Sequence, residues 1–365
     1  MPVFRKNTIL ILTVFLLMSI ITPVFASETD AVREEGLTIE QAVAMALNYS
    51  KTLKQSALDV EKSEEQRNAA ADAVSFIPLE YSGYSEADRA YTSLLSADIS
   101  WAMSKKNLDM SEDRISLSVF NAYVGVVQAG ENVEYAREAL NSASLEWSAA
   151  NTKYRLGMLS SLEKNSADTQ YQSAQRSLQL AEIELTTACQ ALNKLIGLST
   201  DERPLLTQKP AYSEMEELDL EAVINQTVNA SPSIWLADKS VDMAELQIKF
   251  YDWATYNSST YRATEISVQQ AALTASESRE QLRQSLRDIY YNILKLEESY
   301  LLQQEAVKLA QESLRVKKLM FEVGLTTKME VQSAQLALQQ AQSSLDAIVF
   351  QHEYLKLVFE KPWAA

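Results

Sequence analysis

The sequence of 365 residues contains one cysteine, one histidine, seven glycines and seven prolines. Cys189 cannot form an intrachain disulfide, and its apolar, helix-like surroundings predict a place in the core. The single histidine, His352, lies late in a long proline-free stretch and is predicted to be structural. No metal-ligand spacing, phosphate-binding loop, nucleophile motif or dinucleotide-binding glycine pattern occurs. We therefore predict no metal site, no cofactor and no enzymatic activity.

Long apolar runs are also missing, except at the N-terminus. Arg5 and Lys6 precede a mostly apolar segment, residues 7–21, and Ala26 ends a plausible cleavage site. This pattern is typical of a secretory signal peptide over residues 1–26, so we expect the chain to be exported. The alternative is a single N-terminal membrane anchor, although a spanning helix needs about 20 apolar residues.

Positive charge is scarce, because 33 basic residues face 49 acidic residues, a net charge of −16. Removing Arg5 and Lys6 leaves 31 basic residues against the same 49 acidic ones, a net charge of −18. So acidic a chain is not expected to bind nucleic acid or anionic lipid as its main partner.

The chain does contain an internal repeat. Residues 154–160 (Tyr-Arg-Leu-Gly-Met-Leu-Ser) and 321–327 (Phe-Glu-Val-Gly-Leu-Thr-Thr) lie 167 positions apart (321 − 154), each between two proline-free stretches with helical periodicity. Gly157 and Gly324 mark tight helix-to-helix turns that need a positive φ or a close backbone approach. Further matches at this offset include Tyr123 with Tyr290, Glu138 with Glu305, Gln172 with Gln339 and Ala174 with Ala341. A period of this length indicates two copies of one supersecondary unit.

An earlier segment repeats at a second offset. Residues 37–40 match residues 218–221, 181 positions later (218 − 37). The difference between the offsets, 181 − 167, predicts 14 additional residues in the first copy, between about residues 75 and 105. We expect residues 79–103 to be of mixed structure, with a weak strand-like alternation over residues 94–101.

The rest of each copy is predicted to be helical. Expected helices cover residues 39–48, 50–74, 104–154 and 161–196, and then 221–229, 231–253, about 261–321 and 328–360. Ala, Ser, Gln and Glu dominate them, with apolar residues spaced by three and four, as in coiled coils. We predict an all-α fold of long antiparallel helical hairpins in two tandem repeats. A 50-residue helix would be about 75 Å long; such a hairpin cannot bury both faces in a monomer, so we expect an oligomer.

These boundaries predict a domain plan for the chain. A signal peptide (1–26) is followed by a first repeat (27–200), a linker (201–217) marked by Pro204 and Pro210, and a second repeat (218–365). The two repeats are expected to form one elongated domain.

The arrangement resembles the TolC-like outer membrane efflux protein family. The resemblance rests on residues 37–48 (Leu-Thr-Ile-Glu-Gln-Ala-Val-Ala-Met-Ala-Leu-Asn), on the two glycine-centred turns and on residues 192–197 (Leu-Asn-Lys-Leu-Ile-Gly). Family members are typically trimers whose hairpins form a tube across the periplasm, while a β-barrel crosses the outer membrane. The resemblance therefore implies a homotrimer that meets a periplasmic adaptor protein and an inner-membrane pump, and expels drugs, metals or proteins.

The same resemblance implies that the two turns are the pump-side tips, where the adaptor binds. The family's turn pattern is close to Tyr-x-Val-Gly-Leu, which Gly324 and Leu325 match well and Gly157 and Met158 match loosely. The expected partner-binding residues are Tyr154, Leu156, Gly157, Met158, Phe321, Val323, Gly324 and Leu325. The alternative is that the glycines only close tight turns.

A carboxylate follows each glycine by six residues, at Glu163 and Glu330. By resemblance these residues would line a constricted pore mouth, where six carboxylates in a trimer would raise one another's pKa and attract cations. The alternative is an ordinary solvated glutamate on a helix.

The sequence departs from the family at the opposite pole. A membrane-crossing strand needs about 9–11 residues, and the second copy offers only about a dozen residues around 256–266. Since an open sheet edge is not tolerated in lipid, we predict little or no β-barrel. Aromatic residues at this pole favour either a membrane interface or the packed end of a bundle; the membrane-pole candidates are Tyr81, Tyr84, Trp101, Trp253 and Tyr256.

The preferred hypothesis is a TolC-like efflux duct component that docks an adaptor and a pump through its tips. The alternative is an exported helical scaffold or interaction protein of the cell envelope without a channel. The duplicated turns favour the duct, because a scaffold need not keep them in both copies. The resemblance implies an outer membrane location. The missing strands also allow a periplasmic or cell-surface location, so the sequence does not decide whether the chain contacts a membrane.

Overall fold

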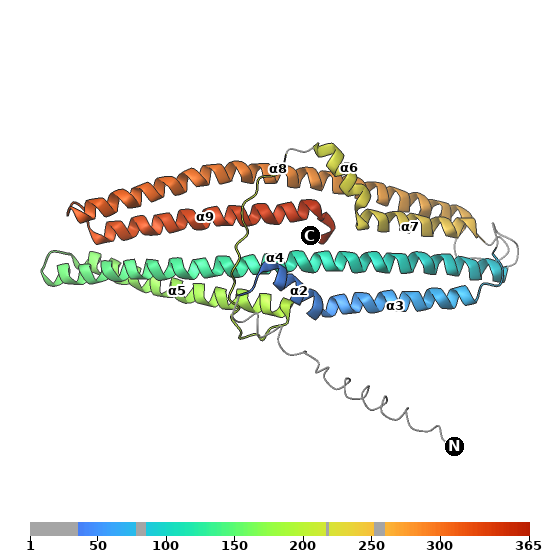
Figure 1. Ribbon diagram of the computed structural model, residues 1–365, viewed down its shortest axis with the longest axis horizontal. Helices are drawn as coiled ribbons and strands as arrows, with labels where there is room; N and C mark the ends of the chain where they lie inside the picture. The colour runs from blue at the N-terminus through green and yellow to red at the C-terminus, as the bar shows by residue number, and fades with distance from the viewer. Residues whose placement is uncertain (1–35, 78–84, 217–218, 252–259) are drawn as a thin grey trace, which may run out of the picture.

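The computed structural model describes residues 36–77, 85–216, 219–251 and 260–365, and these form two repeats of four helices each (Figure 1). The predicted signal peptide lies outside the described residues. The first repeat contains α2 (Ile39–Tyr49), α3 (Lys51–Asp72), α4 (Ser85–Arg155) and α5 (Ser161–Ile196). The second contains α6 (Leu220–Ala230), α7 (Pro232–Lys249), α8 (Tyr261–Glu322) and α9 (Lys328–Glu360), followed by a short 3-10 turn, Pro362–Ala364.

The helix boundaries repeat at the two offsets found in the sequence. Helices α6 and α7 start 181 positions after α2 and α3. Helix α8 ends, and α9 begins, 167 positions after α4 ends and α5 begins. The predicted all-α fold of tandem hairpins is thus confirmed.

The additional residues of the first copy lengthen helices. The prediction of a mixed segment with strand-like alternation was therefore wrong over residues 85–103, while residues 79–84 lie outside the described residues. Helix α3 has 22 residues against 18 in α7, and α4 has 71 against 62 in α8. Residues 94–101 are helical because α3 lies alongside, and Arg67 of α3 binds Asp98 of α4 at 2.7 Å. A half-buried helix face and a short alternating strand give similar patterns over so few residues.

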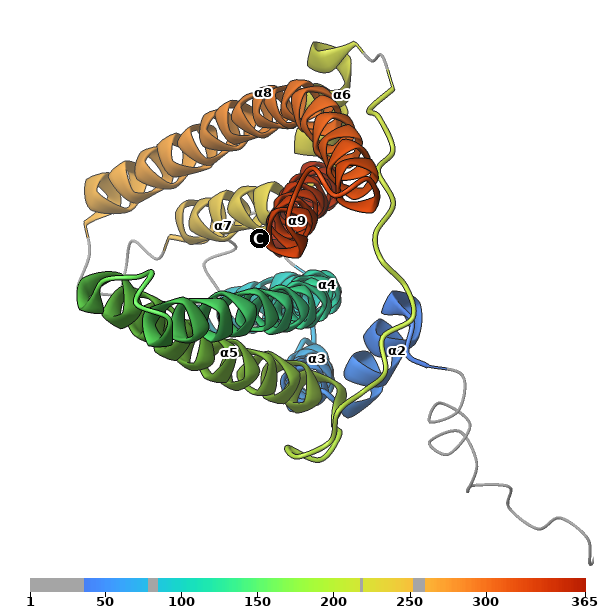
Figure 2. The ribbon, with the colours of Figure 1, turned by 90° about the vertical axis from the view of Figure 1, so that its left-hand side faces the viewer.

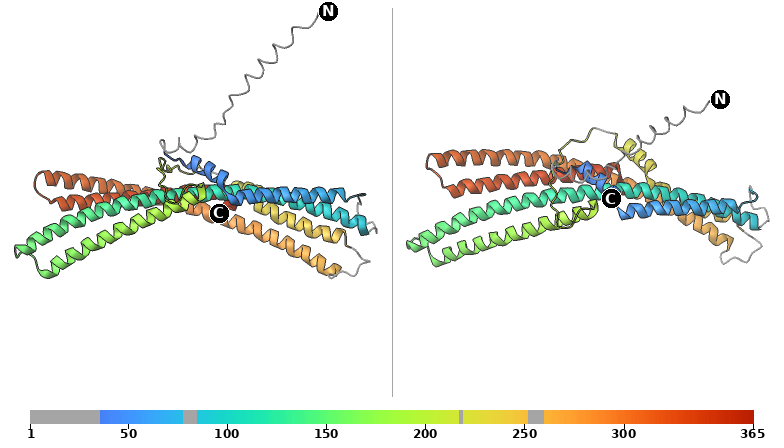
Figure 3. Two further views of the ribbon diagram at one scale, coloured as in Figure 1. Left: turned by 90° about the horizontal axis from the view of Figure 1, so that it is seen from below. Right: turned by 60° about the horizontal axis from the view of Figure 1, so that its bottom comes forward.

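The helices are stacked in layers along one long axis. From one side to the other the order is α8, then α9 and α7, then α4, then α5 and α3, as two perpendicular views agree (Figures 1 and 2). The two hairpin turns lie at the same end of the molecule, and the repeats cross near its middle (Figure 3). At a rise of about 1.5 Å per residue, the 71 residues of α4 span roughly 105 Å.

The core is densest near the middle, where equivalent positions of both repeats are buried. Val119 and Val126 of α4 pack with Leu192 and Cys189 of α5, so Cys189 is a core residue as predicted. Leu286 and Ile293, their counterparts 167 positions later, pack with Ile224 and Val228 of α6. Toward the tips the buried clusters are smaller: Val133, Ala136 and Ala181 in one hairpin, and Val307, Leu314 and Leu338 in the other.

The linker between the repeats crosses the long helices near their middle (Figure 1). Leu206 forms a parallel bridge with Leu37 at the start of the first repeat. Across the described ranges this isolated bridge is the one strand-like pairing, and no helix in them is both long and apolar enough to cross a membrane.

Candidate functional site

The first hairpin turn is a Schellman motif centred on Gly157. The amide of Met158 donates to the carbonyl of Lys153 at 2.9 Å, and the amide of Gly157 donates to the carbonyl of Tyr154 at 3.0 Å. These two bonds satisfy carbonyls that the end of α4 would otherwise leave unpaired.

The second turn repeats this geometry. The amide of Leu325 donates to Met320 at 2.8 Å, and the amide of Gly324 donates to Phe321 at 3.0 Å. Ser160 and Thr327, also equivalent, then cap α5 and α9 by accepting from the amides of Glu163 and Glu330.

Within this chain the two tip glycines are needed for their backbone angle and not for space around their Cα atoms. Gly157 has φ 72° and Gly324 has φ 77°, the left-handed region that disfavours a side chain. A Cβ at either position would meet nothing within 4 Å. Of the two reasons considered from the sequence, the positive φ therefore holds and close backbone approach does not.

Large apolar side chains project into solvent around both turns. Leu156 and Met158 are 69% and 72% exposed, and Val323 and Leu325 are 69% and 73% exposed. Tyr154 and Phe321 are about half exposed. The sequence analysis missed Leu162, which adjoins the first turn and is 78% exposed; its place one residue into α5, beside the glycine turn, could have suggested it. Together these residues form the apolar tip surface: Tyr154, Leu156, Met158, Leu162, Phe321, Val323 and Leu325.

A hollow at this end of the molecule is lined almost entirely by the first hairpin. A pocket of about 210 Å³ is lined by Lys153 of α4, Leu159 of the turn, Glu163 of α5 and Met329 of α9. Both turns lie at this end of the molecule, and we refer to the pair as the combined tip (Figure 1).

The two tip carboxylates, Glu163 and Glu330, form hydrogen bonds and an ion pair within their own hairpins. Glu163 completes a capping box, because its Oε2 accepts from the amide and hydroxyl of Ser160 at 2.9 and 2.7 Å. Glu330 Oε2 accepts from Lys317 Nζ of α8 at 2.5 Å. These hydrogen bonds, from the Ser160 hydroxyl and from Lys317, hold the pKa of Glu163 and of Glu330 below the usual value. Helix capping and ion pairing thus account for both carboxylates in the single chain, and pore lining stays a prediction.

Most of the membrane-pole candidates lie outside the described residues: Tyr81, Tyr84, Trp253 and Tyr256. Trp101 is described on α4, partly buried, with Lys105 Nζ 3.4 Å from its ring centroid and the Arg67 guanidinium 5.9 Å away. At the same pole, Tyr91 packs edge-to-face on Phe250, which directly follows α7, with centroids 5.8 Å apart. These described contacts are those of a packed bundle end.

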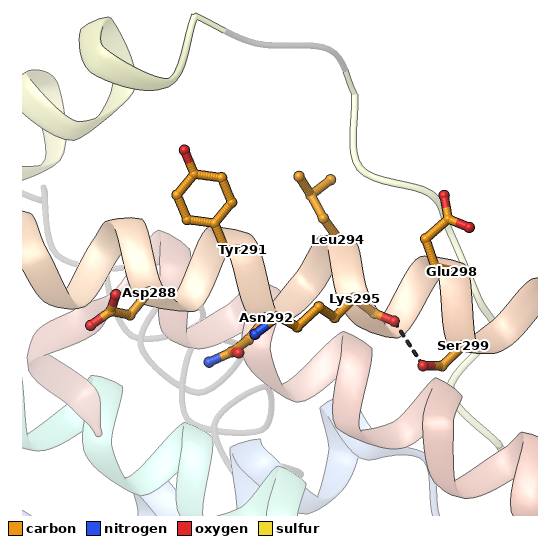
Figure 4. A pocket seen from close by; sticks show the side chains of 7 residues that line it. All are labelled: Asp288, Tyr291, Asn292, Leu294, Lys295, Glu298 and Ser299. Carbon is orange, nitrogen blue, oxygen red and sulfur yellow. Dashed lines mark hydrogen bonds between the residues drawn. The ribbon is translucent and has the colours of Figure 1, made fainter.

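A wide hollow of about 1030 Å³ lies along α8 (Figure 4). Its lining comes from one helix, and Tyr291, Leu294 and Glu298 project outward from it. The one hydrogen bond drawn among these residues runs from the Ser299 hydroxyl to the carbonyl of Lys295. Polar groups do not converge as in a ligand site. Over the described residues, no group of histidine, cysteine and carboxylate side chains could hold a metal.

The family model described as "Outer membrane efflux protein" matches residues 237–347, which span α7, α8 and much of α9. No curated protein matches the chain in sequence.

Solved structures similar to this one include outer membrane proteins and channels. A structure of CusC, described with transmembrane channel formation, has a TM-score of 0.68 at 13% identity and covers 90% of this chain and 92% of its own. The outer membrane protein VceC of Vibrio cholerae gives 0.63 at 14% identity, covering 89% and 95%. The MtrE outer membrane channel of Neisseria gonorrhoeae, in its open state, gives 0.58 at 15% identity, covering 88% of each chain.

These matches are to efflux proteins and channels and not to enzymes, in agreement with the prediction from the sequence. The predicted resemblance is confirmed: the chain carries the outer membrane efflux protein pattern over residues 237–347 and has the fold of TolC-like channel proteins along nearly all of its described length.

Proposed function

We propose that this chain is a subunit of an efflux duct in the cell envelope, and that its combined tip docks an adaptor protein of an export pump. The observation that carries the proposal is the apolar tip surface. Four side chains more than two-thirds exposed sit on two equivalent, rigid Schellman turns at one end of the molecule. Exposed apolar groups on preorganised turns are the chemistry of a protein contact.

A tube also requires contacts between subunits, and α8 offers one. Leu302, Leu309 and Val316 recur every seven residues on α8 and are exposed, Leu302 by 74%. Helix α8 lies at one edge of the layered stack and α5, which exposes Leu180 and Ile183, lies at the other (Figure 2). A seven-residue apolar repeat is the pattern of a coiled-coil seam. We infer that α8 of one subunit packs on α5 of the next, in a head-to-tail ring.

The family resemblance supports three subunits in that ring, with an adaptor and an inner-membrane pump beyond the tip. The matched structures are outer membrane channels, which supports an envelope location for this chain. The exported helical scaffold or interaction protein is the competing function, and it does not require the same apolar surface at both turns.

The proposal is tested by placing a photoreactive amino acid at Leu156 or Leu325 in the native host. We expect both positions to cross-link to an adaptor protein with a long helical hairpin. Leu273, 71% exposed near the opposite end of α8, is the matched control and should not cross-link to it. The duct proposal fails if neither tip position captures an adaptor and if export persists when Leu156 and Leu325 are replaced by Ser.

A further inference from the structure

His352, the single histidine of the chain, is completely buried where α8, α9 and the linker meet. The ring of Tyr212, from the linker, lies between it and α8. This ring stacks on Tyr300 with centroids 3.8 Å apart and lies 5.0 Å from the His352 ring. The proposed efflux function makes no use of this cluster.

Both ring nitrogens of His352 face carboxylate oxygens. Nδ1 lies 3.0 Å from Glu353 Oε1, and Nε2 lies 3.2 Å from Glu297 Oε1 of α8. The same two oxygens accept backbone amides of the linker, from Ser213 at 3.2 Å and from Met215 at 2.8 Å. Each of these oxygens therefore accepts a hydrogen bond from the linker. We assign the hydrogen between each oxygen and the facing ring nitrogen to the nitrogen.

A neutral imidazole cannot make both contacts, because it has one N–H donor and one bare nitrogen. The imidazolium form donates from both nitrogens, and the two carboxylates balance its charge. Lys356 adds a second positive charge, 3.7 Å from Glu353 Oε2, and donates to the carbonyl of Ser213 at 2.7 Å.

Charged and titratable groups surround this site on every side. Helix α8 contributes Glu297 and Tyr300, α9 contributes Glu353 and Lys356, and the linker contributes Tyr212 and Glu214.

We propose that His352, Glu297 and Glu353 form a charge-dependent clasp that holds linker residues 212–215 on the α8–α9 hairpin and loosens when the imidazole loses a proton. When His352 loses a proton, one ring nitrogen faces its carboxylate oxygen with a lone pair instead of an N–H group. One hydrogen bond is lost and a repulsive contact replaces it, on the same oxygens that hold the linker amides.

The other half of the linker provides a built-in comparison. It is held by Tyr123 of α4, whose hydroxyl donates to the carbonyl of Leu37 at 2.8 Å and accepts from the amide of Gln208 at 3.2 Å. Burial raises the pKa of the Tyr123 hydroxyl, so this attachment stays uncharged across the neutral range. Loosening at higher pH is therefore confined to the part of the linker near His352.

The protonation state can be read directly, because selective ¹⁵N-histidine labelling of the chain with a histidine-free tag gives one pair of ring signals. We expect two N–H nitrogens of similar shift in the acidic part of a pH titration, and one bare nitrogen in its alkaline part. In Glu297→Gln, the bare nitrogen should appear at a lower pH. One bare nitrogen across the whole range in the wild-type chain overturns the proposal.

Hydrogen exchange tests the effect on the linker. After correction for the intrinsic pH dependence of exchange, protection of the Ser213 and Met215 amides should fall about tenfold over the same range, as for a lost charged hydrogen bond. The Gln208 amide should keep its protection. His352→Gln should show low protection at 213 and 215 at every pH and unchanged protection at 208. Protection at 213 and 215 that is equal in both chains, or independent of pH, contradicts the clasp.

Discussion

Trp147 of α4 donates its indole N–H to Asp168 of α5 at 2.7 Å, across the first hairpin and close to its tip. The Trp147 ring also stacks on Tyr171, with centroids 5.3 Å apart, and Lys164 binds Asp168 at 2.5 Å. The positions 167 residues later hold Leu314, Gln335, Leu338 and Val331. One hairpin is thus joined near its tip by a polar aromatic contact, and the other by a small apolar cluster.

This difference predicts that the first hairpin remains stable when its polar aromatic contact is replaced by leucines like those of the second hairpin. The double variant Trp147→Leu with Tyr171→Leu should change the free energy of unfolding by about 1 kcal/mol or less, since apolar packing is kept. Trp147→Ala alone should cost about 2 kcal/mol, because the stacked ring is lost with nothing in its place. Urea unfolding followed by circular dichroism measures both, and a double variant less stable than Trp147→Ala would contradict this equivalence.

Alanine should destabilise the protein at the tip glycines but not at a glycine inside α4. Gly157→Ala or Gly324→Ala forces a side chain to adopt a positive φ and should cost about 1 kcal/mol each. Gly130→Ala is the matched control. Gly130 lies inside α4 and a Cβ there meets nothing within 4 Å, so alanine should stabilise the helix by up to about 1 kcal/mol. Changes of the same sign at positions 130 and 157 would contradict this account of the turns.

Acid should weaken the cap at the start of α5. The pKa of Glu163 is lowered by hydrogen bonds from the Ser160 hydroxyl and amide, so the stability it contributes is present above the unfolded-state pKa of about 4.3 and is lost as the pH falls through the lower folded-state value. Ser160→Ala should cost about 1 kcal/mol near neutral pH and less in acid, and should raise the pKa of Glu163.

Thr327→Ala is the control for this prediction. Glu330 owes its lowered pKa first to Lys317, so its pKa should stay low in that variant. Carboxyl ¹³C NMR titration of both variants makes the comparison. A pKa of Glu163 that is unchanged by Ser160→Ala would contradict the capping account.

The repeat and the helix caps could be predicted from the sequence because each rests on local chemistry. Gly157, Gly324 and Gly197 need a positive φ, and Ser160 and Thr38 are cap residues followed three positions later by Glu or Gln. These signals indicate, from nearby residues alone, where α2 begins, where α5 begins and ends, and where α4 and α8 end.

The start of α4 and the clasp at His352 could not be predicted, because both depend on distant contacts. Residues 85–103 are helical beside α3, as the pairing of Arg67 with Asp98 shows. His352 meets Glu297 and the linker from 55 and more than 100 positions away. The exposure of the tip residues could not be predicted from hydrophobic periodicity either, because periodicity does not distinguish an apolar residue in a turn from one in a core.

The apolar seam of α8 should control assembly without affecting the fold of the subunit. Leu302→Ser with Leu309→Ser changes two exposed side chains, so the free energy of unfolding of the monomer should change by about 0.5 kcal/mol per site or less. The same change removes the apolar contact between neighbouring subunits and should shift the chain toward monomer. Leu156→Ser with Met158→Ser, at the tip, is the control that should leave the oligomeric mass unchanged.

The proposed ring of subunits is tested most directly by the mass and shape of the chain from Ser27 onward in detergent-free buffer, by light scattering with small-angle X-ray scattering. The account predicts an elongated trimer that Leu302→Ser with Leu309→Ser dissociates. A wild-type chain that stays monomeric at every concentration tested would contradict the self-assembling duct and would support the exported scaffold.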